Sequence, residues 1–562
     1  MTSRRDFLQR GAAALVASSL PLPARAVPGI ARARRASGAP LVDLSRPPDA
    51  IVAQTASGIE RLGPSAVTGR WASAHVEVTL ASIEQATRVA LAASVGVARV
   101  TLRWNADLSP VRLMLGDAWE RGYGDLEWRG FVPDRVMPWY VLAFDGARTD
   151  GYGVRTGAAA FCWWQMDPEG LTLHADVRSG GMPVTLGART LNMCELIYRA
   201  GEDGESPFAA LRAFCGVMCP APRLPSGPVY GHNDWYYAYG DNSAETMRAD
   251  ATHIVELSPT GGNRPFVVID DGWQPGRGAS KAGAGCWDRG NEKFPDIPGL
   301  LADVKGLGAR PGVWMRPLQA PDDAPESWRL PREHGVLDPT VEGAREKIAA
   351  DVGRLAQWGF ELIKHDYSTW DLFGRWGFQM GSSLTKDGWT FAEGPRRTSA
   401  EVVNALYATI RAAAGSAIVI GCNTVSHLSA GQFEMCRVGD DTSGEEWART
   451  RKMGVNSLAF RAAQSGAFYV ADPDCAAVTA KEPWALASAW LDLVARSGTM
   501  CFVSLAPDAL GAEQKRAVRA ALAAAAEAQP LAQALDWQRC TVPSRWMLMG
   551  EETRYDWKFA EG

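Results

Sequence analysis

Apolar and polar residues alternate between about residues 70 and 220 with the two-residue period of β-strands. The alternation is clearest at 75–80, 98–104 and 171–177, and Gly, Asp and Pro interrupt it between these stretches. A strand with one apolar face packs that face against another layer of structure. The pattern therefore predicts an antiparallel β-sandwich at 71–220, preceded by a linker and an initial strand at 27–70.

From Pro228 onward, short apolar runs alternate with longer stretches of helical period. Candidate strands lie at 228–236, 265–272, 310–316, 360–366, 417–423, 435–441, 467–472 and 499–505. Helical patterns separate most of them, at 243–257, 341–358, 399–413, 445–464, 484–496 and 512–528. This order favours a (β/α)8 barrel at 225–530 over an open sheet. The remaining residues, 531–562, leave room for a very short C-terminal β extension, so the chain is expected to be multidomain.

The N-terminal residues have the features of an export signal. Arg4 and Arg5 precede an apolar run at 11–20, and an Ala-Arg-Ala sequence ends at Ala26. These features resemble a twin-arginine (Tat) signal peptide at 1–26, although an ordinary N-terminal helix is the alternative. The sequence thus predicts a bacterial protein that the Tat machinery exports and that is periplasmic or secreted.

Composition narrows the class of protein. Hydrophobic residues make up 46% of the 562 residues, charged residues make up 22%, and the formal net charge is −5. This balance is typical of a globular protein and argues against a nucleic-acid partner. No apolar run reaches the roughly 18 residues that a membrane-spanning helix needs. The ten cysteines show no zinc-binding spacing. Export permits disulfides between them, whereas their apolar surroundings are typical of buried free thiols.

Polar and aromatic residues collect where the expected barrel strands end, and barrel enzymes place their chemistry at those ends. The strand ends read His232-Asn-Asp-Trp235, Asp270-Asp-Gly-Trp273, Trp314-Met-Arg-Pro317, Lys364-His-Asp366, Cys422-Asn423, Arg437-Val-Gly-Asp-Asp441 and Asp472-Pro-Asp474. One Asp at a strand end is ordinary helix capping, but this many beside Trp, Lys and Arg indicates a polar, aromatic cup.

Two carboxylates in such a cup suit retaining glycoside cleavage, in which one is the nucleophile and a second, about 5 Å away, is acid and then base. Lys364 and Asp366 are two positions apart, so both should face the barrel while His365 points away. A cation beside Asp366 would keep it ionised, although a purely structural ion pair is the alternative. Asp440 and Asp441 are adjacent, so at most one faces the substrate, and spacing does not choose between them.

The remaining polar and aromatic residues suit sugar binding. Asp270 and Asp271 have no further carboxylate or His at metal-ligand spacing, so they are expected to bind hydroxyls rather than a metal, with loop capping as the alternative. Tryptophan faces pack on pyranose rings, and five Trp lie near these carboxylates, although core packing is the alternative for each. They are Trp235, Trp273, Trp287, Trp314 and Trp370.

Six segments, in this order, resemble the α-galactosidases of glycoside hydrolase family 36, which is related to family 27. They are 266–274 (FVVIDDGWQ), 286–295 (CWDRGNEKFP), 312–317 (GVWMRP), 363–366 (IKHD), 437–442 (RVGDDT) and 472–474 (DPD). The segment 115–124 (LGDAWERGYG) and the β domain around it resemble the β-sandwich that precedes the barrel in family 36.

The resemblance implies retaining hydrolysis of terminal α-galactosides by double displacement, without metal or cofactor. The family's Lys-x-Asp motif falls on Lys364 and Asp366, which makes Asp366 the nucleophile. Its Arg-x-x-x-Asp motif falls on Arg437 and Asp441, which selects Asp441 as acid/base. The substrate-binding positions that the resemblance implies are Asp270, Asp271, Trp287, Trp314, Lys364, Cys422 and Arg437.

The chain departs from the family in three places. His365 stands where the family usually has an apolar residue, and the C-terminal β domain is absent or reduced to a hairpin. Residues 421–428 match no pattern of the family, which leaves galactose and N-acetylgalactosamine open as the sugar. A raffinose synthase-like transglycosidase and, from a different class, a carbohydrate-binding protein without turnover are the alternative functions.

Overall fold

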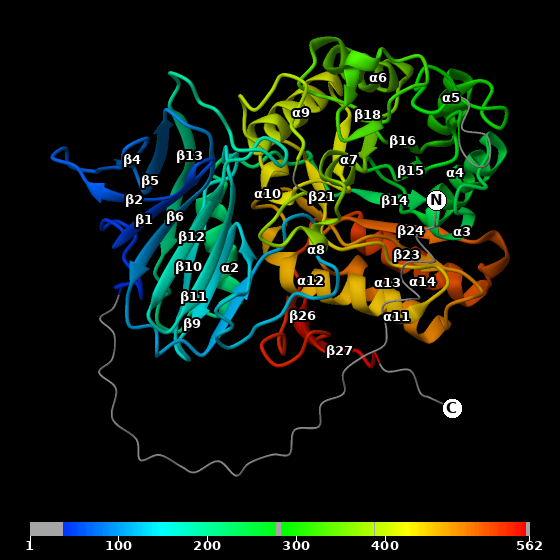
Figure 1. Cartoon of the computed structure of the whole chain (residues 1–562). Helices are drawn as coiled ribbons and strands as arrows, with labels where there is room; N and C mark the ends of the chain where they lie inside the picture. Colours follow the sequence, from blue (N-terminus) through cyan, green and yellow to red (C-terminus); the bar gives the residue numbers. More distant parts are fainter. Residues whose placement is uncertain (1–37, 277–282, 387, 558–562) are drawn as a thin grey trace, which may run out of the picture. The chain divides into compact units, whose positions relative to one another are not determined.

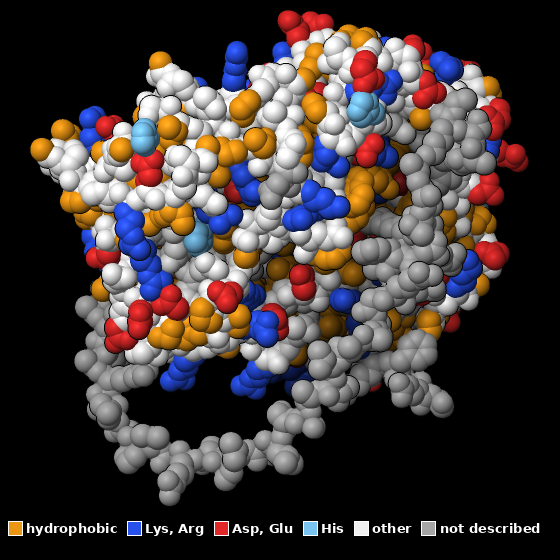
Figure 2. Space-filling view, viewed as in Figure 1, with side chains coloured by type: hydrophobic (Ala, Val, Ile, Leu, Met, Phe, Trp, Pro, Cys, Tyr) orange, Lys and Arg blue, Asp and Glu red, His pale blue; other side chains and the backbone are white. Residues whose placement is uncertain are grey.

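The computed structural model describes residues 38–276, 283–386 and 388–557. The expected signal peptide at 1–26 lies outside the described residues. Among the described residues, no helix is both long enough and apolar enough to cross a membrane. On the face drawn in Figure 2, basic and acidic side chains are interspersed.

The first part of the described chain is an antiparallel β domain (Figure 1). Within the described residues its thirteen strands pair in the order β7-β9-β10-β13-β5-β4-β3-β2-β1-β6-β12-β11-β8. Their bounds are β1 (Ala50–Thr55), β2 (Gly58–Pro64), β3 (Arg70–Ala72), β4 (Val76–Ile83), β5 (Ala86–Ala93), β6 (Val97–Asn105), β7 (Leu113–Gly116), β8 (Met137–Pro138), β9 (Tyr140–Phe144), β10 (Thr149–Val154), β11 (Phe161–Asp167), β12 (Gly170–Asp176) and β13 (Leu191–Arg199). The three alternating stretches of the sequence fall on β4, β6 and β12. The sheet begins earlier than expected, because β1 and β2 both lie within 27–70.

The second part is a parallel sheet with helices outside it (Figure 1). Within the described residues its nine strands follow the order β22-β21-β20-β19-β16-β15-β14-β24-β23. They are β14 (Tyr230–Asn233), β15 (Phe266–Ile269), β16 (Arg310–Met315), β19 (Leu362–His365), β20 (Ile418–Gly421), β21 (Met435–Arg437), β22 (Val470–Asp472), β23 (Ala476–Val478) and β24 (Cys501–Leu505). Each of the expected strands is present. The two outermost strands, β22 and β23, are separated in the chain only by residues 473–475.

In the part of the chain that the structure describes, five helices lie at expected places: α4 (Ala244–Leu257), α6 (Glu342–Trp358), α9 (Ser399–Ala413), α13 (Trp484–Ala495) and α14 (Ala512–Ala525). A further helix between β15 and β16, α5 (Ile297–Leu307), is not among those expected. Capping residues explain where several of these helices begin and end. Thr398 and Glu401 form a capping box at the start of α9. Gly308 and Gly359 end α5 and α6 with φ of 102° and 108°, which glycine adopts without strain.

Residues 445–464, expected to form one helix, are divided into four short elements. These are α11 (Trp447–Thr450), the π-helical turn η2 (Arg451–Val455), α12 (Asn456–Arg461) and the 3-10 turn η3 (Ala462–Gln464). A Cβ atom at Gly454 would lie 2.7 Å from the Trp490 ring, so glycine in this turn lets the tryptophan approach. The division matters for the site, because α11 and α12 each carry an arginine that reaches it.

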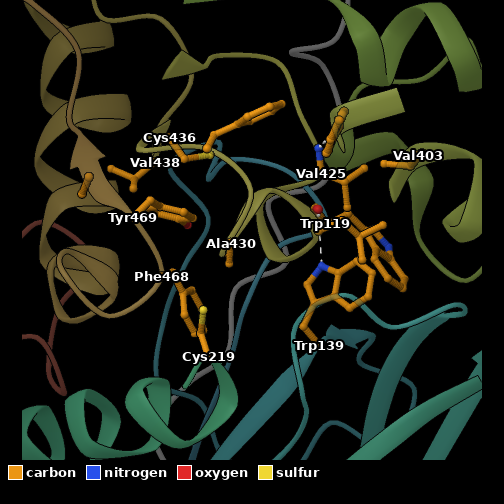
Figure 3. Packing of buried hydrophobic residues seen from close by; sticks show 14 of the residues in the cluster. Trp119, Trp139, Cys219, Val403, Val425, Ala430, Cys436, Val438, Phe468 and Tyr469 are labelled. Carbon is orange, nitrogen blue, oxygen red and sulfur yellow. Dashed lines mark hydrogen bonds between the residues drawn. The ribbon is translucent and has the colours of Figure 1, made fainter. Parts of the chain in front are cut away.

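One buried hydrophobic cluster includes residues of both parts (Figure 3). Trp139, between β8 and β9, stacks on His427 of α10 (Ser426–Ser429) with ring centroids 4.9 Å apart. The Trp139 Nε1 also donates to the Trp119 carbonyl at 3.4 Å, a bond drawn as a dashed line in Figure 3. The antiparallel domain therefore packs directly on loops that follow the parallel strands.

The chain ends in a small antiparallel sheet. Its strands are β25 (Gln533–Ala534), β26 (Arg545–Leu548) and β27 (Glu551–Arg554). Its size fits the short β extension expected at 531–562. All ten cysteines lie within the described residues, and each is a free thiol.

Candidate active site

Lys364 lies at the end of β19, and its partner differs from the one expected. Its Nζ lies 2.6 Å from Asp270 Oδ2, at the end of the second strand. Burial works to lower the pKa of Lys364, but attraction to Asp270 outweighs it, so the pKa is raised well above its usual value. Among the described residues, the ion pair of this lysine is with Asp270 rather than with Asp366. Lys364 is therefore a buried cation that orients Asp270.

Asp366 follows β19 and keeps both carboxylate oxygens oriented by donors. Trp314 Nε1 donates to Oδ2 at 3.0 Å, and the backbone NH of Tyr367 donates to Oδ1 at 2.7 Å. Tyr367 has φ of 68°, a left-handed conformation that costs a non-glycine residue about 1–2 kcal/mol. Such strain is concentrated at functional sites. The aspartate is half-buried, so it is fixed in orientation yet accessible.

Trp287 and Trp314 lie together but differ in exposure. Their ring centroids are 6.1 Å apart, and those of Trp273 and Trp287 are 5.8 Å apart. Trp273 Nε1 donates to the Trp314 carbonyl at 2.9 Å. The exposed fraction of Trp287 is 0% and that of Trp314 is 4%. In this structure Trp314 contacts the nucleophile candidate, and Trp287 packs behind Trp314 instead of lining an open surface.

Asp270 and Asp271 have different surroundings. Asp270 is buried, and its Oδ2 also accepts from Asn233 Nδ2 at 2.8 Å. Its backbone NH donates to Asp234 Oδ1 at 2.8 Å. Burial and the charge of Asp270 raise the pKa of Asp234 to about 8, which keeps that side chain protonated at neutral pH. Asp271 is half-buried and accepts from Gln274 Nε2 at 2.6 Å. Both carboxylates lie at the end of the second strand, as expected.

The structure distinguishes Asp440 from Asp441. Asp440 uses both oxygens in ion pairs, with Arg121 Nη2 at 2.7 Å and Arg449 Nη2 at 2.8 Å, and its side chain is 8% exposed. Asp441 Oδ1 lies 3.3 Å from Arg437 Nη2, and its side chain is 22% exposed. Asp441 is therefore the more accessible of the two carboxylates at the end of the sixth strand.

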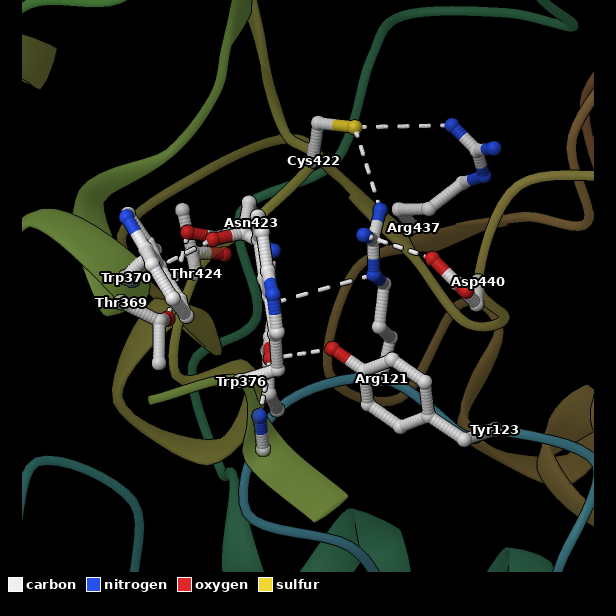
Figure 4. A network of polar contacts seen from close by, with 12 residues as sticks. Arg121, Tyr123, Thr369, Trp370, Trp376, Cys422, Asn423, Thr424, Arg437 and Asp440 are labelled. Carbon is white, nitrogen blue, oxygen red and sulfur yellow. Dashed lines mark hydrogen bonds and ion pairs between the residues drawn. The ribbon is translucent and has the colours of Figure 1, made fainter. Parts of the chain in front are cut away.

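Cys422, after β20, lies between the two strand ends that carry Asp366 and Asp441. Arg437 Nη1 and Arg121 Nη1 lie 3.4 Å and 3.8 Å from its Sγ (Figure 4). Burial and then the charge of Asp366 raise the pKa of this thiol well above its usual value, so the thiol is neutral. The buried side chain of Cys422 therefore contacts both arginines and lies within the electrostatic influence of Asp366.

Four residues of this site were not predicted as site residues from the sequence: Tyr236, Asp474, Arg449 and Arg121. Arg437 forms an ion pair with Asp474 and donates to Tyr236 Oη at 3.2 Å. Asp474 belongs to a strand end that the sequence marked, and Tyr236 directly follows another. Arg449 lies in a stretch expected only as helix. Arg121 comes from the β domain, where the segment 115–124 is unusual in composition but gives no sign of reaching another part of the chain.

His365 points away from the carboxylates, as alternation along the strand predicts. Its exposed fraction is 0%, and its ring packs against Tyr407 and Phe433 with centroids 5.7 Å and 5.6 Å apart. Neither ring nitrogen has a hydrogen-bond partner among the described residues. Burial lowers its pKa to about 3. A neutral histidine thus occupies an apolar position.

Replacing His365 by Phe is expected to raise the free energy of unfolding by about 1–3 kcal/mol at pH 7.5, because it removes an unsatisfied buried polar group. The gain should grow at lower pH. The pKa of His365 is about 3 in the folded protein and about 6.5 in the unfolded chain. Wild-type stability from this residue is therefore complete above pH 6.5 and is lost as pH falls toward 3, by about 1.4 kcal/mol per unit.

Urea unfolding of both proteins at pH 7.5, 6.0 and 5.0 measures this difference. His75→Gln is the matched control, because His75 is exposed and paired with Glu60. We expect that substitution to change stability by less than about 0.5 kcal/mol. A stability difference for His365→Phe that does not change with pH would refute the explanation.

Compared by sequence, the chain matches no protein-family model and no curated protein. Compared by structure, it resembles an α-galactosidase from Thermus thermophilus in complex with p-nitrophenyl α-D-galactopyranoside, with a TM-score of 0.59 at 17% identity over 85% of this chain and 97% of that one. A variant GH36 α-galactosidase from Geobacillus stearothermophilus in complex with raffinose gives 0.53 at 14% identity over 86% and 71%. The galactosidase domain of an α-galactosidase-sucrose kinase gives 0.54 at 15% identity over 84% and 73%. The described chain therefore has the fold of these α-galactosidases, as the resemblance in its sequence implied.

Proposed function

We propose that this protein is a retaining glycoside hydrolase that cleaves terminal α-galactosides. The observation that carries the proposal is the pair of accessible carboxylates after the fourth and sixth strands. Asp366 is oriented by Trp314 and by its own loop, and Asp441 is oriented by Arg437. The similar folds belong to α-galactosidases whose structures contain p-nitrophenyl α-D-galactopyranoside, stachyose or raffinose.

The finer architecture is part of the proposal. We infer that residues 473–475 join β22 and β23 as one seventh strand, so that the parallel sheet closes into a (β/α)8 barrel. We also infer that the antiparallel strands fold into the two layers of a β-sandwich. The first inference rests on the strand order, in which β22 pairs with β21 and β23 pairs with β24.

The chemistry that follows is a double displacement. Asp366 attacks the anomeric carbon from the face opposite the leaving group, while Asp441 gives its proton to the departing glycosidic oxygen. A β-galactosyl ester on Asp366 results. Asp441, now a carboxylate, takes a proton from water as that water attacks the anomeric carbon and releases α-galactose. The Trp314 Nε1 donor holds Asp366 in line for the first attack.

The remaining site residues are proposed to bind the sugar. Asp270 and Asp271 accept from hydroxyls, and Lys364, held by Asp270, donates to a hydroxyl next to the nucleophile. Trp314 offers an aromatic edge beside the reacting carbon. Cys422, with Arg437 beside it, lies on the side of the 2-position. Export by the Tat pathway to the periplasm or beyond is proposed from the N-terminal sequence alone.

A panel of nitrophenyl glycosides tests the function. We expect the protein to cleave the α-galactoside faster than the α-N-acetylgalactosaminide and the β-arabinopyranoside. Faster cleavage of the α-N-acetylgalactosaminide would reassign the sugar. Transfer of galactose to added sucrose in place of water would indicate a transglycosidase. Tight sugar binding by calorimetry without any product would contradict hydrolysis and leave a binding protein.

A further inference from the structure

We propose that Arg121, which the antiparallel β domain supplies, is a positioning residue for the acid/base carboxylate of Asp441, an assignment that rests on the proposed function. Its role is to hold Asp441 where the departing oxygen needs a proton. The β domain would then complete the catalytic site rather than only stabilise the chain.

The contacts of Arg121 carry the proposal. Its side chain is 3% exposed, its Nη2 lies 2.7 Å from Asp440 Oδ1, and its Nη1 lies 3.4 Å from Asp441 Oδ1. The same Nη1 lies 3.8 Å from Cys422 Sγ, and Figure 4 draws this contact as a dashed line. One guanidinium group therefore contacts both neighbouring carboxylates and the thiol at the centre of the site. A guanidinium has a planar, fixed set of donors, so it restricts the geometry of both carboxylates.

The segment that carries Arg121 is joined to the residues after β21, which include the two carboxylates. The backbone NH of Gly122 donates to the Val438 carbonyl at 2.8 Å, and the Asp440 NH donates to the Gly122 carbonyl at 2.8 Å. A Cβ atom at Gly439 would lie 2.6 Å from the Met453 carbonyl oxygen, so glycine allows this loop to pack closely against η2. Backbone hydrogen bonds between the two segments therefore place Arg121 next to the carboxylates.

Buried side chains hold the segment in place. Arg461 of α12 donates to Asp117 Oδ1 at 2.8 Å and to the Glu120 carbonyl at 2.8 Å. The Glu120 carboxylate accepts from the NH of Gly377 and from the Tyr123 hydroxyl, each at 2.7 Å. These contacts fix Arg121 before any substrate binds, as preorganisation requires.

The charges of two neighbouring aspartates explain why the site needs Arg121 in addition to Arg437. Asp440 and Asp441 are neighbours in the chain, and two close carboxylates repel each other. Arg121 and Arg449 engage both oxygens of Asp440, which holds that carboxylate away from the reaction. Arg437 and Arg121 both contact Oδ1 of Asp441. Without Arg121, Asp440 would lose a buried partner and Asp441 would lose a contact with a buried arginine.

Two substrates with different leaving groups can distinguish a role of Arg121 in positioning the acid from a general structural role. A 2,4-dinitrophenolate departs without a proton, whereas the sugar of raffinose departs only as the acid protonates it. The ratio kcat/KM includes only steps up to formation of the galactosyl enzyme. Misplacing Asp441 should therefore lower kcat/KM for raffinose far more than for 2,4-dinitrophenyl α-galactoside, while a loss of folded protein lowers both equally.

The test compares Arg121→Met, Arg121→Lys and the control Arg135→Met in the full chain. Arg135 donates to the carbonyls of Glu127 and Met114, which flank the same segment, but the described contacts of Arg135 do not include the carboxylates. For Arg121→Met we expect kcat/KM to fall about 100-fold on raffinose and less than about fivefold on the dinitrophenyl substrate. Arg121→Lys should recover part of the loss on raffinose. Arg135→Met should change both substrates by the same factor.

Three results would overturn the assignment. They are an equal loss on both substrates with Arg121→Met, selective loss on raffinose with Arg135→Met, or full wild-type activity of Arg121→Met on raffinose. If Arg121→Met does not fold, the ratio of the two substrates for Arg121→Lys decides the question. Failure of the proposed function is distinguishable, because the wild-type protein would then cleave neither galactoside.

Discussion

Replacing Asp366 by Ala is expected to lower kcat/KM for an aryl α-galactoside by about 10⁴-fold or more. The loss should be this large because, in the proposed mechanism, the side chain forms the covalent bond to the sugar, and the neighbouring carboxylates have other partners. Asp270 is paired with Lys364, and Asp441 is held by Arg437. The K364–D270 pair remains in the variant, so sugar binding should weaken far less than turnover does.

Azide identifies the role of the missing carboxylate. In Asp366→Ala, azide can enter the space of the nucleophile and displace the leaving group once, which inverts the anomeric carbon and gives β-galactosyl azide. Asp322→Ala is the control, because Asp322 is an exposed carboxylate in the loop after β16. Unchanged turnover in Asp366→Ala, or α-galactosyl azide from that variant, would exclude Asp366 as the nucleophile.

Replacing Asp441 by Ala is expected to lower kcat/KM for raffinose by about 10²–10⁴-fold and to leave that for 2,4-dinitrophenyl α-galactoside within about tenfold. The dinitrophenyl group needs no proton, so the first displacement proceeds on Asp366. The second displacement then lacks its base, and the galactosyl enzyme accumulates. Azide needs no base and should accelerate this step, which gives α-galactosyl azide after two inversions.

Asp440→Ala is the matched comparison, because the two aspartates are neighbours and only their partners differ. Asp440 has both oxygens in ion pairs with Arg121 and Arg449. We expect no azide product from that variant. Azide rescue of Asp440→Ala but not of Asp441→Ala would reverse the assignment of the acid/base.

Periodicity predicted most of the fold, because strands and helices with one buried face show it in the sequence. The expected strand at 310–316 is β16 at Arg310–Met315, and the expected helix at 399–413 is α9 at Ser399–Ala413. The helix expected at 445–464 is divided by a turn that packs against Trp490. The sequence does not show this division, because the apolar pattern continues through the turn. One initial strand was expected within 27–70, whereas the described part of this stretch contains two, β1 and β2. The stretch is rich in Ala, Pro, Gly and Arg, and its alternation is weak.

The sequence supplied candidate residues for the site, but not their pairings, and it did not indicate that Arg121 or Arg449 takes part. Alternation gave the side of the strand on which Lys364 lies, yet the partner of the lysine, Asp270, comes from another strand, 94 positions away. Spacing could not choose between Asp440 and Asp441, because the choice depends on Arg121 and Arg449. Arg121 is 320 positions from Asp441, and no local pattern records a contact of that range.

The anomer of galactose that is released first tests double displacement most directly. The full chain is incubated with an aryl α-galactoside, and proton NMR follows the anomeric signals before mutarotation mixes them. We predict that α-galactose appears first and that β-galactose grows in later, because two inversions at the anomeric carbon restore its configuration. If β-galactose is the first product, or if no galactose is released, Asp366 is not the nucleophile of a retaining α-galactosidase.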